Sequence, residues 1–120
     1  MAFAQGPLLM LHLSDSDLLK TDAYIDGVWT SADSGARFTV TNPATGDALA
    51  EVADLGETET RRAIEAANRA MAGWKAKTAK ERAVIMRKWF ELIMAAQEDL
   101  AQLMTAEQGK PLAEARGEVA

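Results

Sequence analysis

The chain has 120 residues, of which 48% are hydrophobic and 26% are charged, so it is long and apolar enough for one domain with a hydrophobic core. It has no cysteine and a single histidine, His12, which excludes disulfides, cysteine nucleophiles and histidine-based metal clusters within these residues. Its 13 basic and 18 acidic side chains give a net charge of −5, which argues against a nucleic-acid-binding protein.

The first thirteen residues are mostly apolar but lack the positively charged start and the small-residue cleavage site of a signal peptide. We interpret residues 1–13 as an irregular leader and residues 14–120 as the structured part. No apolar run is long enough to cross a membrane, so we expect a soluble cytoplasmic protein.

The first half of the chain predicts two β-hairpins. Residues 23–29 place β-forming side chains on both sides of Asp26-Gly27, a dipeptide that favours a tight turn because both positions need positive φ. Residues 37–41 then alternate as a half-buried strand. Residues 42–46 contain Pro and Gly at turn positions, and residues 49–52 predict the returning strand.

The second half predicts three helices. The first begins near Gly56, with Thr58 as its N-cap. The second begins at Thr78, which is spaced from Glu81 as in a capping box, and we expect it to run to about Glu107.

Gly109 is expected to end the second helix, and Pro111 suits the first turn of a third helix, where its missing N–H is not needed. The apolar pattern of this third helix is interrupted at Ala120, which indicates a truncated chain, although a helix that frays at a natural end would look the same. The unfinished apolar face consists of Leu112, Ala115 and Val119.

The helices carry apolar stripes that include Trp74 and Trp89, and we expect these stripes to form the core. The neighbouring basic residues are then an exposed face rather than a nucleic-acid-binding patch. Acidic side chains that lie off the stripes are expected to be solvated rather than to form an acid/base pair: Glu65, Glu91, Glu98 and Asp99.

Several segments resemble the opening of an aldehyde dehydrogenase, in the same order and at the same spacing: residues 24–29, 41–46, 66–70 with Trp74, 107–112 and 117–119. The resemblance covers residues 14–120. It implies an α/β fold, in which this chain is the incomplete amino-terminal portion of the cofactor-binding domain, without the Rossmann-like sheet of the full enzyme.

Within the family, residues 59–64, 78–83, 89–90 and 103–111 most resemble bacterial NADP-dependent succinate-semialdehyde dehydrogenases. That likeness implies oxidation of succinate semialdehyde to succinate with NADP or NAD, in 4-aminobutyrate degradation, by a homo-oligomer without a nucleic-acid or membrane partner. Glutarate-semialdehyde dehydrogenases share nearly the same residues and remain an alternative. A non-enzymatic helical module, which would bind a partner through the unfinished third helix, is a second alternative.

The resemblance implies a cysteine thiolate that attacks the aldehyde, a glutamate that activates water, and a cofactor-binding sheet. In the family all three lie downstream of this segment. We therefore assign no catalytic residue and no cofactor-binding residue, and we expect the chain alone to be inactive and to bind no cofactor.

Some relatives hold a monovalent cation with backbone carbonyls before the Asn-Pro turn and a carboxylate before Gly-Lys-Pro. The corresponding positions here are Val40, Thr41 and Glu107. A hard cation needs more oxygen ligands than these residues supply. We therefore favour the alternative in which no metal binds and Glu107 stabilises the helix junction.

Overall fold

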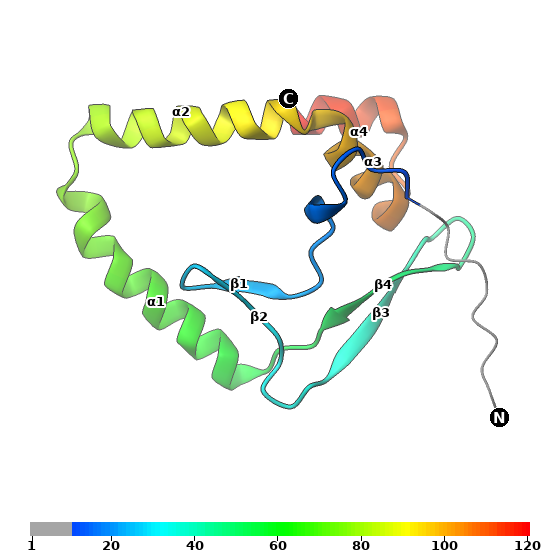
Figure 1. The fold of residues 1–120 in the computed structure, drawn as a ribbon, viewed down its shortest axis with the longest axis horizontal. Coiled ribbons are helices and arrows are strands. Elements are labelled where there is room, and N and C mark those ends of the chain that lie inside the picture. Colours follow the sequence, from blue (N-terminus) through cyan, green and yellow to red (C-terminus); the bar gives the residue numbers. More distant parts are fainter. Residues whose placement is uncertain (1–10) are drawn as a thin grey trace. The chain divides into compact units, whose positions relative to one another are not determined.

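The computed structural model describes residues 11–120, which form two β-hairpins followed by four α-helices (Figure 1). Of the leader predicted for residues 1–13, only residues 11–13 are described, and they are neither helix nor strand. The chain divides into two compact units. The described residues of the first are 11–21, 39–52 and 93–120, and the second consists of residues 22–38 and 53–92.

The second unit contains the hairpin of β1 (Ala23–Ile25) and β2 (Val28–Thr30). Asp26 and Gly27 have φ angles of 52° and 79°, so the tight turn predicted for this dipeptide is confirmed. In the antiparallel register Tyr24 pairs with Trp29, and the ring centroids lie 5.1 Å apart.

Helix α1 (Glu57–Ala76) begins two residues earlier than a Thr58 cap would allow, so that cap prediction is wrong. Its N-cap is Gly56, and because glycine has no side chain, the cap is made by the Glu59 carboxylate, which accepts the Gly56 N–H at 3.2 Å. The capping box of the next helix is confirmed. The Thr78 N–H donates to Glu81 at 2.7 Å, and the Glu81 N–H donates to the Thr78 hydroxyl at 3.3 Å.

The single helix expected from Thr78 to Glu107 is two helices, α2 (Ala79–Ala95) and α3 (Gln97–Gln108). Ala96 separates them with φ −100° and ψ 11°, and its N–H donates to the carbonyl of Ile93 three residues back. The apolar residues recur through the break without a change of period, which is why the sequence pattern did not reveal it.

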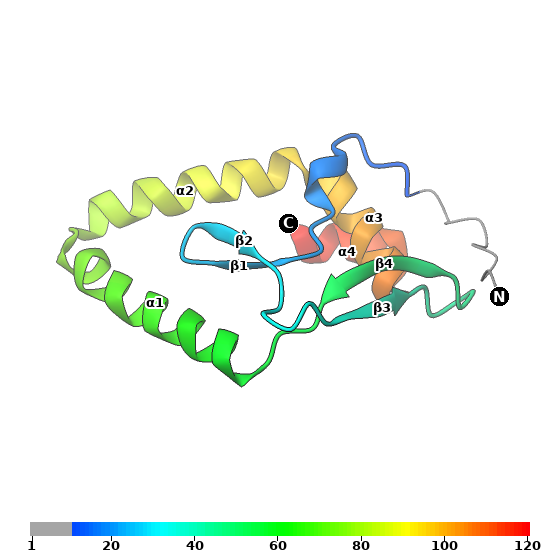
Figure 2. The same ribbon diagram turned by 60° about the horizontal axis from the view of Figure 1, so that its bottom comes forward.

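The first unit contains most of the second hairpin, β3 (Arg37–Thr41) and β4 (Ala48–Ala53), together with η1 (Ser16–Leu18), α3 and α4 (Leu112–Val119). β3 and β4 lie side by side in Figures 1 and 2, and the turn between them closes with an Asn42 N–H to Asp47 carbonyl bond of 2.8 Å. Gly109 ends α3 with φ 80°, as predicted, and Pro111 caps α4.

Helix α4 packs against α3, and the small side chains of Ala101 and Ala115 are fully buried. Arg116 on α4 forms a bidentate ion pair with Glu98 on α3, with N···O distances of 2.7 and 2.8 Å. The unfinished apolar face predicted for this last helix is therefore already occupied at its centre, since α3 covers Ala115.

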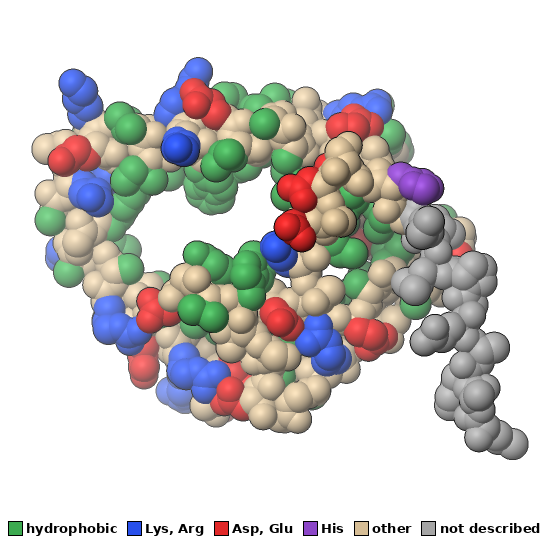
Figure 3. Space-filling view, viewed as in Figure 1, with side chains coloured by type: hydrophobic (Ala, Val, Ile, Leu, Met, Phe, Trp, Pro, Cys, Tyr) green, Lys and Arg blue, Asp and Glu red, His purple; other side chains and the backbone are tan. Residues whose placement is uncertain are grey.

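The apolar stripes expected to form the core of the two longest helices are largely exposed. Ile64 on α1 is 63% exposed, and Trp89 and Leu92 on α2 are 59% and 61% exposed, whereas Trp74 is half-buried. Figure 3 shows hydrophobic side chains along the surface of α2. The periodicity was correct, but within this chain the stripes have little to pack against. No helix in residues 11–120 is long and apolar enough to span a membrane.

Candidate functional site

Two of the three residues proposed for a cation line one small cavity in the first unit. The cavity has a volume of about 40 Å³, and Val40 of β3 and Glu107 of α3 both line it. Thr41 is exposed and is not part of the lining. The other lining residues are Leu11, Leu19, Lys20, Leu49, Ala50, Val52 and Leu103.

The cavity offers little to a metal ion. Its volume has room for about one to three water molecules. Among the lining side chains, Glu107 supplies the carboxylate, Lys20 supplies an ammonium group, and the rest are apolar. Within residues 11–120 no group of three or more histidine, aspartate or glutamate side chains is arranged to hold a metal ion. The cation site therefore stays a prediction.

The helix that carries Glu107 also anchors the amino-terminal segment, through a carboxylate that the sequence did not reveal. Asp99 is only 6% exposed, and its two oxygens accept the backbone N–H groups of Ser14 and Asp15, both at 2.9 Å. The expectation that Asp99 is solvated is thus wrong. Its partners lie 84 and 85 residues away, so no local pattern could have indicated them.

A second buried carboxylate, Glu59, has a similar role in the second unit. It is 5% exposed and accepts N–H groups from Asp33 at 2.8 Å and from Gly56 at 3.2 Å. Hydrogen bonding from the Asp33 amide, followed by that from its own backbone, holds the pKa of Glu59 below its usual value. A carboxylate whose two oxygens both accept backbone amides is suited to holding a loop rather than to moving a proton.

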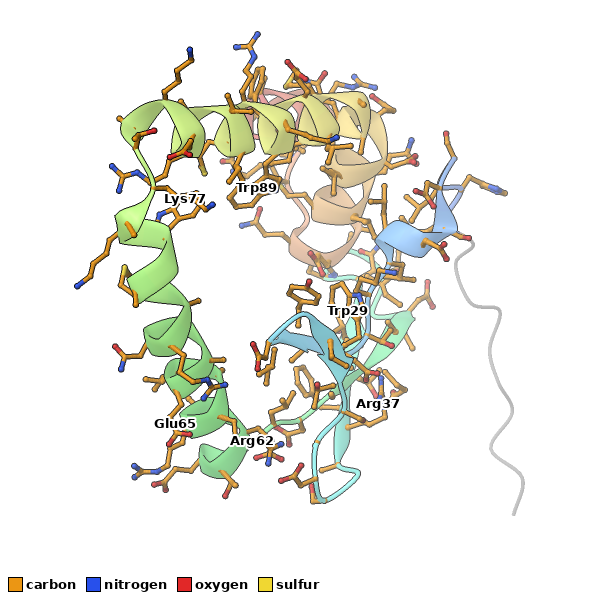
Figure 4. All side chains as sticks on the ribbon, turned by 60° about the vertical axis from the view of Figure 1, so that its left-hand side comes forward. Trp29, Arg37, Arg62, Glu65, Lys77 and Trp89 are labelled. Atoms are coloured by element: carbon orange, nitrogen blue, oxygen red, sulfur yellow. The ribbon has the colours of Figure 1, made fainter. Side chains whose placement is uncertain are left out.

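A larger cavity of about 330 Å³ lies in the second unit between the first hairpin and α1. It is lined by two arginines, but each already bonds an aspartate: Arg62 meets Asp33 in a bidentate pair at 2.7 Å, and Arg69 meets Asp26 at 3.2 Å. The bond from Arg62 lowers the pKa of Asp33. Figure 4 shows Arg62 and Glu65 projecting from the same part of α1. The paired guanidinium groups make this cavity a poor phosphate site.

The family model described as "Aldehyde dehydrogenase family" matches residues 29–120 of the chain. The chain belongs to this family of oxidoreductases. Its α/β fold, with two small sheets and helices, is the one expected from the resemblance. The absence of catalytic and cofactor-binding residues from these 120 residues stays a prediction.

Three curated relatives cover nearly the same part of the chain. It is 60% identical to a 3-sulfolactaldehyde dehydrogenase of Pseudomonas putida and 56% identical to a glutarate-semialdehyde dehydrogenase of the same species, each over 92% of this chain. It is 57% identical, over 91% of its length, to an NADP(+) succinate-semialdehyde dehydrogenase of Escherichia coli. The chain spans only 23% of the length of each relative.

The solved structure of a succinate-semialdehyde dehydrogenase from Burkholderia pseudomallei matches with a TM-score of 0.87 and 56% sequence identity. The match covers 90% of this chain and 22% of that structure. The fold of the chain is therefore that of one portion of a much longer relative.

Proposed function

We propose that this chain is the amino-terminal part of an NADP-dependent succinate-semialdehyde dehydrogenase and that it has no activity by itself. Residues 14–120 are then the incomplete first portion of the cofactor-binding domain. The observation that carries the proposal is the exposed apolar surface of α1 and α2, in a chain that spans 23% of the length of its relatives.

Eight large apolar side chains on two helices are exposed. Full burial of one large apolar side chain stabilises a protein by about 1.5–3 kcal/mol, and soluble monomers rarely expose large contiguous apolar patches. These side chains are consequently best explained as a surface that further polypeptide covers. They are Ile64 and Met71 on α1, and Val84, Ile85, Met86, Trp89, Phe90 and Leu92 on α2.

The names of the relatives support a substrate class more strongly than one substrate. Succinate semialdehyde, glutarate semialdehyde and 3-sulfolactaldehyde are all short aldehydes that carry an acidic group. We propose succinate semialdehyde as the substrate and NADP as the cofactor for two reasons: the name of the Escherichia coli relative, and the resemblance of residues 103–111 to enzymes of that kind. Glutarate semialdehyde, and NAD, remain alternatives. The same proposal includes three properties of the full enzyme: it acts in 4-aminobutyrate degradation, it is located in the cytoplasm, and it is a homo-oligomer.

The proposed inactivity of the chain rests on its side chains. A thiolate nucleophile requires a cysteine, and the 120 residues contain none. The alternative of a partner-binding module loses its main support, because the face of α4 that was to bind a partner is packed on α3 at Ala115.

The test compares two purified proteins: the 120-residue chain, and the gene product in the full length that the source cell makes. Each is given succinate semialdehyde, glutarate semialdehyde or 3-sulfolactaldehyde with NADP or NAD, and formation of reduced nicotinamide is followed. We expect turnover only in the cellular product, with the highest kcat/KM for succinate semialdehyde and NADP.

Turnover by the pure 120-residue chain would overturn the proposed inactivity. A higher kcat/KM for glutarate semialdehyde would replace the substrate, and absence of turnover with every aldehyde would reject the enzymatic proposal. Binding of an unrelated protein by a cooperatively folded 120-residue chain would instead favour the module.

A further inference from the structure

The amino-terminal segment of the first unit, residues 11–19, which we call the strap, covers part of that unit's interior. Its end residues Leu11 and Leu19 line the 40 Å³ cavity together with Leu49 of β4 and Leu103 of α3. Leu11 also lines a second cavity, of about 400 Å³, between the turn of the second hairpin and the end of α3. The strap therefore forms part of the wall of both cavities.

One side chain holds the strap by hydrogen bonds. The carboxylate of Asp99 on α3 is only 6% exposed, and it accepts the N–H groups of Ser14 and Asp15, both at 2.9 Å. Within residues 11–120, these two are the only hydrogen bonds between the strap and another element. Hydrogen bonds to a charged acceptor are about twice as strong as those between neutral groups, so Asp99 can hold the strap by itself.

The other hydrogen bonds of the strap are internal and depend on the same residue. Asp15 accepts the N–H of Asp17 with its carboxylate at 3.0 Å and the N–H of Leu18 with its carbonyl at 3.3 Å, which forms η1. A helical turn of three residues is not stable by itself. We therefore expect η1 to be lost whenever Asp15 leaves Asp99.

We propose that the strap opens and closes over the two cavities as a single cooperative segment, and that Asp99 is the positioning residue that keeps it closed. Opening removes part of the cavity walls and gives water access to Leu49 and Leu103. Segments held by few contacts open locally at a lower free energy than the whole protein. The proposal does not depend on the substrate or the cofactor proposed above, since its measurement is hydrogen exchange rather than turnover.

The experiment measures amide hydrogen exchange by mass spectrometry, resolved to single residues, in the gene product in the full length that the source cell makes. In the wild type we expect the amides of Ser14, Asp15, Leu18 and Leu19 to share one opening equilibrium. They should exchange faster than the amides at the centre of α3, because the strap opens without unfolding of that helix.

Three variants make the result specific. Asp99→Asn leaves one oxygen for two N–H groups, so exchange should become about 10- to 100-fold faster, by the same factor at every strap amide, as expected for the loss of one hydrogen bond to a charged acceptor. Glu98→Gln is the matched control, because Glu98 is the exposed neighbour on α3 and bonds Arg116 of α4. It should leave exchange in the strap unchanged. Leu19→Ala weakens packing at the far end of the strap, and it should nevertheless accelerate exchange of the two N–H groups that Asp99 holds.

Three outcomes would overturn the proposal. Strap amides that exchange as slowly as the centre of α3 in the wild type would show that the strap opens only when the helix unfolds. Acceleration by Asp99→Asn that is confined to Ser14 and Asp15 would show that η1 does not open with them. Equal effects of Asp99→Asn and Glu98→Gln would show that the hydrogen bonds to Asp99 do not keep the strap closed.

Discussion

Gly109, which ends α3, lies against Pro43 in the turn of the second hairpin: a Cβ atom at Gly109 would come within 3.0 Å of Cγ of Pro43. Gly109 also has φ 80°, a conformation that costs other residues about 1–2 kcal/mol. The end of the helix and the turn of the hairpin can thus approach each other closely because Gly109 has no side chain.

We predict that Gly109→Ala lowers the free energy of unfolding by more than the backbone cost alone, about 1–2 kcal/mol, because the ring of Pro43 must also move. Gly46→Ala is the matched control, since Gly46 has the same φ of 80° but open space around it. Denaturant unfolding of both variants measures the difference. Equal losses would mean that the contact with Pro43 contributes nothing.

The second prediction concerns the anchor made by Asp99. Asp99→Asn leaves one oxygen for the two N–H groups of Ser14 and Asp15, so one buried hydrogen bond to a charged acceptor is lost. We expect a destabilisation of about 1–3 kcal/mol and faster hydrogen exchange at these two amides. Asp47→Asn, at an exposed position in the hairpin turn, is the control and should leave their exchange unchanged.

A third prediction follows from the lowered pKa of Glu59. A carboxylate with a lowered pKa in the folded state stabilises the protein above its unfolded pKa, about 4.3 for glutamate, and this stabilisation is lost as the pH falls through the folded value. Glu59→Gln should therefore be less stable than the wild type at neutral pH, and the difference should shrink on acidification below about pH 4.3.

Unfolding curves between neutral and acidic pH test this expectation, with Glu65→Gln as an exposed control on the same helix. The control should change stability little at any pH. A difference between Glu59→Gln and the wild type that stays constant across the range would contradict the assigned role of the Asp33 and Gly56 amides.

Short-range chemistry accounts for what the sequence predicted well. The Asp26-Gly27 turn and the Thr78–Glu81 capping box depend on residues at most three positions apart, and both are confirmed. The carboxylate of Asp99 could not be assigned in advance, because its partners lie more than 80 positions away in the chain.

The cavity was predictable only in part. The resemblance indicated Val40 and Glu107, and the structure brings both to one cavity. Lys20 was missed because its place there depends on how the segment after η1 returns to α3, which no periodicity records. The exposure of Trp89 was missed for a different reason. The apolar stripe on its helix was identified correctly, but the spacing of apolar residues does not show which part of a protein packs against them.

The last prediction uses that exposure. Trp89 is 59% exposed, and Figure 4 shows its side chain projecting away from α2. In the 120-residue chain, Trp89→Ala should leave the helix content unchanged and reduce aggregation, because it removes apolar surface that contacts water. In the longer product of the source cell the same substitution should cost about 3–5 kcal/mol, as expected for a buried tryptophan.

Leu49→Ala is the matched comparison, because Leu49 is only 8% exposed within this chain. It should lower stability in both proteins, since its packing already exists here. Circular dichroism and light scattering report on the 120-residue chain, and denaturant unfolding reports on the longer product. A small effect of Trp89→Ala in the longer product would mean that α2 stays uncovered there, and the exposed surface would then no longer support the proposal that this chain is part of a larger dehydrogenase.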